Sequence, residues 1–163
     1  MSVNKYKPHL FVVPEDKADK NFAVGFELDA RLAAGSFQIM PLAGGWLKVI
    51  NIINDEYVPK LQQNKYSHVL GIIDCDGDDE RIANELAKFP DEVADRIFLL
   101  GAIETPEIFR QKVGDNSERI GERMAEECFN ESYDLWNHED LAHVSYEIQR
   151  AATTIRPIVF ATH

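Results

Sequence analysis

The amino-acid sequence predicts an α/β fold in which helices flank a mostly parallel, four-stranded sheet. Short apolar runs rich in β-branched residues alternate with segments whose apolar residues recur at helical spacing. Strands separated by helices pair in parallel through right-handed crossovers, so helices are expected on both faces of the sheet. The chain has 163 residues and 45% hydrophobic content, which is enough for one domain with a proper core.

The predicted elements follow one another in a regular order. They are a strand at 10–13, a helix over 14–35, a strand at 37–42, a helix over 46–53, a polar connection at 58–66, a strand at 69–73, a helix over 82–89, a strand at 96–100, a helix from 106, and two helices within 116–154. Thr105 is expected to cap the helix that Pro106 begins. Residues 158–160 predict a terminal edge strand or a docking tail. We expect a single domain over 1–163, with an α/β core at 10–113 and a helical extension at 114–163.

The segment Asp74 to Glu80 places five acids in seven residues directly after the third predicted strand. In an extended chain, side chains two apart point the same way, so Asp74, Asp76 and Asp78 are expected to converge. Crowded carboxylates repel one another unless a cation lies between them, and hard oxygen ligands suit Mg²⁺, Mn²⁺ or Ca²⁺. The segment therefore predicts a divalent-metal site. The alternative is that these acids only cap turns and helices.

Three more loops are expected beside this segment, because the carboxyl ends of parallel strands meet at one edge of a sheet. They are Pro14-Glu15-Asp16, Ala43-Gly44-Gly45 and Glu104 to Glu107. Glycines allow close approach of the backbone, and a helix N-terminus offers N–H groups to an anion. Lys48 and Arg81 are candidates to bind the phosphate group of a substrate at this edge of the sheet. Carboxylates that bind a metal ion, next to backbone amides that bind a phosphate, predict an enzyme that acts on phosphodiesters.

The order of these motifs resembles the Toprim domain of topoisomerases, bacterial primases and overcoming-lysogenization-defect nucleases. A glutamate follows the first strand, a Gly-Gly pair the second, and Asp74 and Asp76 the third, within about residues 10–113. The segment Glu104-Thr105-Pro106-Glu107 resembles the acidic segment that helps hold a second metal in those nucleases. The first motif of the family is usually Glu-Gly, whereas this chain has Glu15-Asp16, so Glu15, Asp16 or neither of them fills that position.

The resemblance implies a Toprim-like, Rossmann-like fold and a metal-dependent nuclease. Asp74 and Asp76 would hold the first Mg²⁺ or Mn²⁺. Glu15 would share that ion or act as general base toward a water molecule, and Glu107, with Glu104, would recruit a second ion. Hydrolysis by metal-activated water is the expected reaction.

Two other interpretations of the acidic segment stay open. Ile72 to Gly77 also resembles the first motif of haloacid-dehalogenase phosphatases, in which the first Asp attacks phosphorus, although Asp78 stands where that family has threonine. A non-catalytic, Toprim-like partner of an ATPase or nuclease is the third interpretation, and the formal net charge of −11 favours it.

Charge and composition limit the expected partners and location. A net charge of −11 predicts that the chain alone binds nucleic acid weakly, so a protein partner or a homo-oligomer is expected to supply a basic surface. No apolar run approaches the length of a membrane span, and the N-terminal residues do not form a signal peptide. The two cysteines offer no disulfide framework, which is typical of a cytoplasmic protein.

Overall fold

Four parallel strands form the central sheet, in the order β2-β1-β3-β4. The computed structural model describes residues 2–141 and 145–160. The strands are β1 (His9–Pro14), β2 (Phe37–Ile39), β3 (Ser67–Ile72) and β4 (Ile97–Leu100). The predicted α/β class and its all-parallel sheet are thereby confirmed, and the fold is Rossmann-like.

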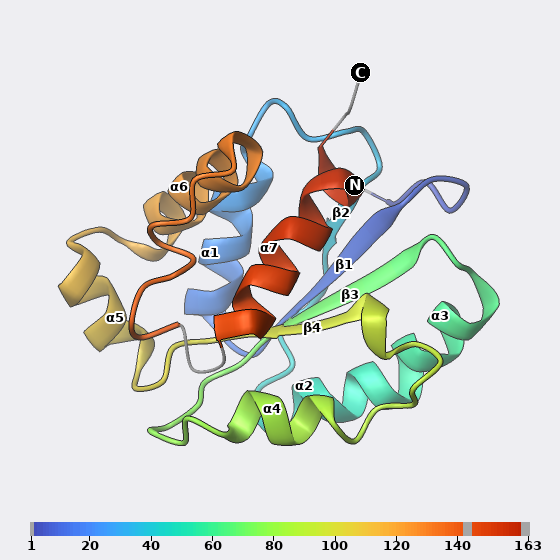
Figure 1. Ribbon diagram of the computed structural model, residues 1–163, viewed down its shortest axis with the longest axis horizontal. Coiled ribbons are helices and arrows are strands. Elements are labelled where there is room, and N and C mark those ends of the chain that lie inside the picture. The colour runs from blue at the N-terminus through green and yellow to red at the C-terminus, as the bar shows by residue number, and fades with distance from the viewer. Residues whose placement is uncertain (1, 142–144, 161–163) are drawn as a thin grey trace.

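Helices cover both faces of this sheet (Figure 1). One face carries α1 (Lys17–Glu27), α5 (Pro106–Val113), α6 (Ser117–Asn130) and the C-terminal α7 (Ser145–Val159). The other carries α2 (Trp46–Ile52), which continues through a π-helical turn (Ile53–Tyr57) into α3 (Val58–Gln63), and α4 (Arg81–Leu86). A 3₁₀ turn (Ala94–Arg96) leads into β4.

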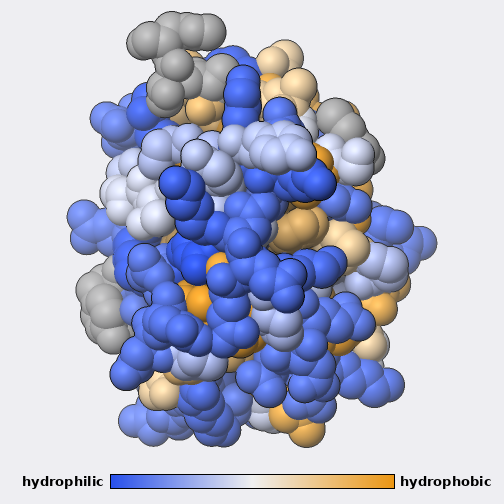
Figure 2. Space-filling view, turned by 90° about the vertical axis from the view of Figure 1, so that its right-hand side faces the viewer, coloured by the Kyte–Doolittle hydropathy of each residue, from blue (hydrophilic) through white to orange (hydrophobic). Residues whose placement is uncertain are grey.

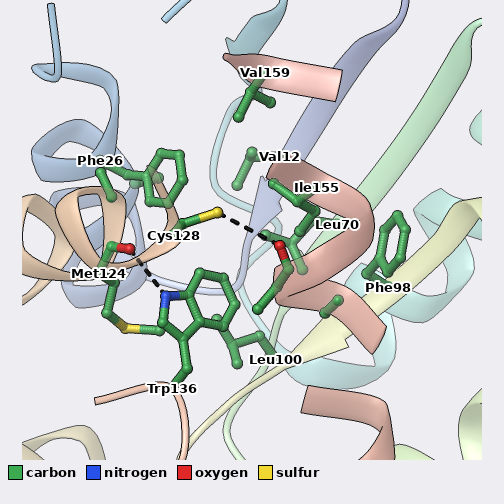
Figure 3. Packing of buried hydrophobic residues seen from close by; sticks show 14 of the residues in the cluster. Val12, Phe26, Leu70, Phe98, Leu100, Met124, Cys128, Trp136, Ile155 and Val159 are labelled. Atoms are coloured by element: carbon green, nitrogen blue, oxygen red, sulfur yellow. Dashed lines mark hydrogen bonds between the residues drawn. The ribbon is translucent and has the colours of Figure 1, made fainter. Parts of the chain in front are cut away.

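The alternation of side chains along each strand creates two hydrophobic clusters. In β1, Leu10 and Val12 face the α1 side, whereas Phe11 and Val13 face the α2 side, and all four are buried. The larger cluster surrounds Trp136 (Figure 3). The indole N–H of that residue donates a hydrogen bond of 2.9 Å to the carbonyl of Met124, which satisfies its only polar atom. Both faces of the sheet are therefore covered by helices.

Two glycines bring α1 and α6 into backbone contact. A Cβ added to Gly121 would lie 2.0 Å from the carbonyl oxygen of Phe22, and one added to Gly25 would lie 1.9 Å from that of Glu118. Real side chains never approach so closely, so either substitution forces the helices apart. This contact holds α1, and therefore the loop that precedes it, against the rest of the fold.

We expect Gly121→Ala to destabilise the protein by about 2–3 kcal/mol, because overpacking at this crossing forces backbone shifts. Helix propensity alone predicts the opposite sign, since alanine is about 1 kcal/mol better than glycine inside a helix. Urea unfolding of the variant, compared with Glu126→Ala on the exposed side of the same helix, separates the two effects. A Gly121→Ala protein as stable as the wild type would show that the helices do not touch.

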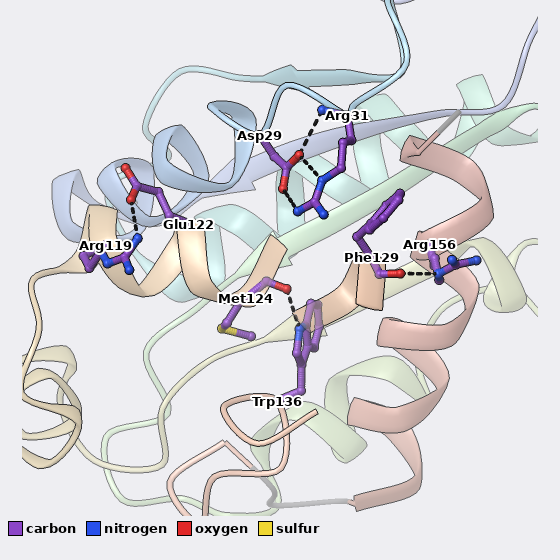
Figure 4. Close-up of polar contacts among 8 residues, drawn as sticks. All are labelled: Asp29, Arg31, Arg119, Glu122, Met124, Phe129, Trp136 and Arg156. Carbon is purple, nitrogen blue, oxygen red and sulfur yellow. Dashed lines mark hydrogen bonds and ion pairs between the residues drawn. The ribbon is translucent and has the colours of Figure 1, made fainter. Parts of the chain in front are cut away.

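The helix expected over residues 14–35 is shorter than predicted. It begins at Lys17, with Asp16 as its cap, and ends at Glu27. The Asp29 carboxylate accepts from the backbone N–H of Arg31 and pairs with its guanidinium at 2.7 Å (Figure 4). The Arg31 guanidinium also lies over the Phe129 ring, 4.0 Å from its centre. Asp29 therefore offers the backbone an alternative to the helix and turns the chain toward β2.

Two other expectations about elements are wrong. Residues 58–63 form α3 rather than a polar connection, because Val58 and Leu61 are buried and proline is tolerated in a first helical turn. Ile158 and Val159 end α7 instead of forming an edge strand, and only Phe160 makes a bridge, to Leu32.

The surface is mainly hydrophilic on the face that Figure 2 shows, which lies over α3 and the loop leading into β3. Apolar residues appear there only as small, separate spots. Within the described residues, no helix combines the length and the apolar character that a bilayer-spanning segment requires.

Candidate functional site

The candidate site lies where neighbouring strands send their connections in opposite directions. The chain leaves β1 through α1 on one face, whereas it leaves β3 through α4 on the other, and these two strands are adjacent. Such a switch point opens a crevice at the carboxyl ends of the strands, where α/β proteins bind ligands. Glu15 directly follows β1 and donates its N–H to the carbonyl of Ile72 at 3.0 Å. Asp74 follows β3 and lies beside Glu15 at the same edge of the sheet.

Glu15 and Asp74 are linked by a short hydrogen bond. The Oε2 atom of Glu15 accepts from the backbone N–H of Asp74. Partial burial raises the pKa of Glu15, and repulsion from Asp74, Asp16 and Asp76 raises it further, although the Asp74 N–H acts in the opposite direction. Burial likewise raises the pKa of Asp74, with repulsion from Asp76 and Asp16 as smaller causes. The fold therefore gathers mutually repelling carboxylates at the switch point.

The acidic segment itself is not extended, so the expected convergence of Asp74, Asp76 and Asp78 through a strand pleat is wrong. β3 ends at Ile72, and Asp76 has a left-handed backbone with φ of 50°. Asp74 Oδ1 accepts from the N–H of Asp76 at 3.2 Å, and Asp78 Oδ1 accepts from that of Glu80 at 3.0 Å. Both bonds stabilise turns of the backbone. Asp78 lies in the turn that precedes α4.

Arg81 at the start of α4 closes the acidic turn. Its Nη1 donates to the carbonyl of Asp74 at 3.0 Å and to Oδ2 of Asp76 at 3.2 Å. Its guanidinium lies over the indole of Trp46, 4.2 Å from the ring centre. Stacking and ion pairing fix the plane of the cation beside the carboxylates. Arg81 therefore lies beside Asp74 and Asp76, and its stacking on Trp46 is a contact that the sequence did not predict.

The Gly-Gly loop also meets the site. The N–H of Gly44 donates to the carbonyl of Glu15 at 2.8 Å, so this amide is already engaged, and Gly45 precedes the first residue of α2. Gly44 has φ of 88°, a conformation that favours glycine. The ammonium of Lys48 lies over Gly44, 3.8 Å from where a Cβ would stand. Lys48 is thus held next to the loop that carries Glu15.

The segment that precedes α5, where Glu104 and Glu107 were expected to bind metal, contacts the acidic turn only through its backbone, in the described part of the chain. The N–H of Gly77 donates to the carbonyl of Ile103 at 2.6 Å. Glu107, in the first turn of α5, is exposed and pairs with Arg110 at 3.7 Å, while the charge of Glu104 acts on Lys112. The structure gives neither carboxylate a contact with Glu15, Asp74 or Asp76, in the parts of the chain that it describes.

Asp19 is a site residue that the sequence interpretation missed. It is only 8% exposed, its N–H donates to Oδ1 of the capping Asp16 at 3.1 Å, and its Oδ2 has no hydrogen-bond partner among the described residues. Burial, followed by repulsion from Asp16 and Glu15, raises the pKa of Asp19 to about 8. A signal was available, because an acid four residues after Glu15 falls one turn further along a predicted helix.

The donors at this site fit a magnesium-type ion that is shared with a substrate. No three His, Cys, Asp or Glu side chains come close enough to enclose a metal, within residues 2–141 and 145–160. Mg²⁺, however, is usually held by one or two carboxylates together with waters and substrate phosphates. Glu15 and Asp74 form such a pair, and the buried carboxyl of Asp19 lies one helical turn beyond Glu15.

Comparisons of the chain with protein-family models, with curated proteins and with solved structures give no match. The function is therefore inferred from the site itself.

Proposed function

We propose that the protein is a divalent-metal-dependent phosphodiesterase of Toprim type that hydrolyses nucleic acid. The observation that carries this proposal is the pair Glu15 and Asp74 at the switch point of a parallel sheet: both carboxyl groups are half-buried with raised pKa values, and the Glu15 carboxylate accepts a hydrogen bond from the backbone N–H of Asp74. Two cations lie near the pair: Arg81 donates to the carbonyl of Asp74, and the ammonium of Lys48 lies over Gly44, whose N–H donates to the carbonyl of Glu15. Carboxylates flanked by cations suit a metal ion and the phosphate that it binds.

Glu15, Asp74 and Arg81 have different roles in the proposed hydrolysis. Mg²⁺ or Mn²⁺ at Glu15 and Asp74 would supply Lewis-acid activation of the phosphodiester and a more acidic bound water. Glu15 keeps its second carboxylate oxygen for the proton of the attacking water, and burial raises its pKa, which makes it a stronger base than an exposed glutamate. Arg81, held in one plane by Trp46, stabilises charge on the phosphate oxygens. A new P–O bond to water forms as the bond to the leaving oxygen breaks.

The negative net charge of the protein opposes the binding of nucleic acid. The chain has 28 acidic residues and 17 lysines and arginines, so its own field repels a polyanion. We infer that a protein partner, or a second copy that completes a basic surface, brings the nucleic acid to the site, and that the protein works in the cytoplasm.

A nicking assay tests the proposed function. Supercoiled plasmid and single-stranded DNA and RNA are incubated with the protein at low salt and Mg²⁺ or Mn²⁺, or with a chelator. We expect cleavage that requires the metal. Cleavage that persists in the chelator, or none with either metal, contradicts the proposal. Hydrolysis of a phosphomonoester that beryllofluoride inhibits would instead favour a phosphatase in which Asp74 attacks phosphorus, and metal binding without either turnover would favour a non-catalytic partner protein.

A further inference from the structure

The acidic residues of the chain are unevenly distributed. Residues 2–14 and 57–73 contain no aspartate or glutamate, although the whole chain has 28 acidic residues. The lysines in these two segments are Lys5, Lys7, Lys60 and Lys65. The segments meet at the amino ends of β1 and β3, where the side-chain amide of Asn64 donates to the carbonyl of Lys5 at 2.9 Å. Lysines are therefore concentrated at the edge of the sheet opposite the candidate metal site.

These four lysines have no acidic partners within the described residues. None of them forms an ion pair with an aspartate or glutamate in residues 2–141 and 145–160. Glu92 borders the same surface, but its carboxylate accepts a hydrogen bond from a side-chain amide of α3. The ammonium of Lys60 lies over the buried ring of Tyr57, 5.0 Å from its centre. The other three lysines are therefore placed to meet an anion from outside the chain.

The loop between α3 and β3 is held in a fixed position. The guanidinium of Arg96 donates to three carbonyls of the segment 61–67, at 2.7, 2.8 and 3.1 Å. On the other side, the N–H of His9 donates to the carbonyl of Tyr66 at 3.0 Å. Lys65 and Tyr66 are therefore presented on a fixed backbone, with the positive charge of Arg96 next to it.

A shallow depression lies between the N-terminal loop and the end of α3, at the end of the molecule that faces the viewer in Figure 2. Two lysines, two tyrosines and three side-chain amides line it. The ammonium groups of Lys5 and Lys65 lie 5.3 Å and 5.2 Å from the ring centres of Tyr6 and Tyr66, respectively. Tyr6 is 74% exposed, which leaves its ring open to a partner. Each tyrosine ring of the depression therefore has a cation beside it.

This combination of side chains favours single-stranded nucleic acid among anionic partners. Aromatic rings stack on bases, lysines pair with phosphates, and side-chain amides can bond the edges of unpaired bases. An acidic peptide would engage the lysines but would leave the tyrosine rings without a role. A membrane surface requires apolar side chains that insert among lipids, whereas the apolar residues on this face are small, separate spots.

We propose that Lys5, Tyr6, Lys65 and Tyr66 form a binding surface for a short stretch of single-stranded nucleic acid, with bases on the tyrosine rings and phosphates at the lysines. The inference goes beyond the proposed hydrolysis, because this surface lies at the opposite edge of the sheet from the acidic pair. The net charge of −11 weakens the binding, so a single chain holds the strand only at low salt.

Fluorescence anisotropy of the full chain tests the surface without metal or turnover. A labelled single-stranded oligonucleotide of about ten nucleotides is titrated with the protein at low salt in a chelator. We expect saturable binding by the wild type and binding about tenfold weaker in Tyr6→Ala, because one stacked base is lost. Tyr6→Phe keeps the ring and should bind like the wild type.

The salt dependence of the same binding tests the lysines. The double variant Lys5→Ala/Lys65→Ala should reduce the slope of log affinity against log salt by about 1.4, since each phosphate contact in a single strand contributes about 0.7. Lys17→Ala/Lys20→Ala is the matched control, because it removes two exposed lysines from α1 and changes the net charge equally. The control should leave the slope unchanged.

The inference is overturned if the wild type shows no saturable binding, if Tyr6→Ala binds as tightly as the wild type, or if the two double variants behave alike. Polyphosphate that binds as tightly as the oligonucleotide, or binding to phosphatidylserine vesicles in place of the oligonucleotide, would also overturn it. Oligonucleotide binding at this surface without cleavage would refute the proposed hydrolysis alone, whereas metal-dependent cleavage without such binding would refute the binding surface alone.

Discussion

Replacing Asp74 with asparagine is expected to reduce metal-dependent cleavage by about 10²–10³-fold, because the variant loses a charged ligand at the centre of the site. Asparagine keeps the side-chain oxygen that accepts from the N–H of Asp76, so the turn that this bond stabilises should persist. The initial rate of nicking at saturating Mn²⁺ measures the effect.

Asp91→Asn is the matched control for this change. Asp91 is an exposed aspartate in the connection between α4 and β4, near the amino end of β4 and so at the opposite edge of the sheet. Its substitution alters net charge as Asp74→Asn does but leaves the site untouched. Equal activity of the two variants would contradict a role for Asp74 in catalysis.

Replacing Asp19 with asparagine is expected to stabilise the protein at alkaline pH. The folded-state pKa of Asp19 is raised to about 8, far above the value of about 4 expected in the unfolded chain. Between these values the folded protein holds a proton that the unfolded chain releases, so the stability of the wild type falls as the pH rises. The asparagine variant does not titrate there. Its advantage should grow from near zero at about pH 4 to about 3–5 kcal/mol at about pH 8.

Urea unfolding across this pH range, in a metal chelator, checks the prediction. The Asp91→Asn protein should follow the wild-type curve, because that side chain is exposed. If the free energy of unfolding depends on pH in the same way for the wild type and Asp19→Asn, then Asp19 is ionised in the folded protein without loss of stability. In that case its unpartnered oxygen must be hydrated in solution.

Local patterns predicted the strands well and the helix boundaries less well. Three of the strands lie where apolar runs occur, since burial on both faces leaves few alternatives for such a run, whereas β2 covers only 37–39 of the expected 37–42. The helical spacing of apolar residues continues past Glu27, yet the Asp29 turn ends α1 there. Conversely, the polar composition of residues 58–66 predicted a connection, whereas residues 58–63 continue the helical segment that begins with α2.

The position of the candidate site could be predicted, but its internal geometry could not. Parallel strands bring Glu15, Gly44 and Asp74 to one edge whatever the details of their loops. The orientation of the side chains depends on loop hydrogen bonds that no periodicity encodes, such as those that turn Asp78 toward α4. The burial of Asp19 depends on how closely α1 and α6 pack, which only the glycine contacts of the folded structure reveal.

Titration of Mn²⁺ by calorimetry into the wild type and Glu15→Gln tests most directly whether the two carboxylates at the switch point share a divalent ion. We predict a specific Mn²⁺ site in the wild type whose affinity falls at least about tenfold in Glu15→Gln, with no change in Asp91→Asn. Equal Mn²⁺ affinity in the wild type and Glu15→Gln, or no Mn²⁺ binding by the wild type, would contradict it.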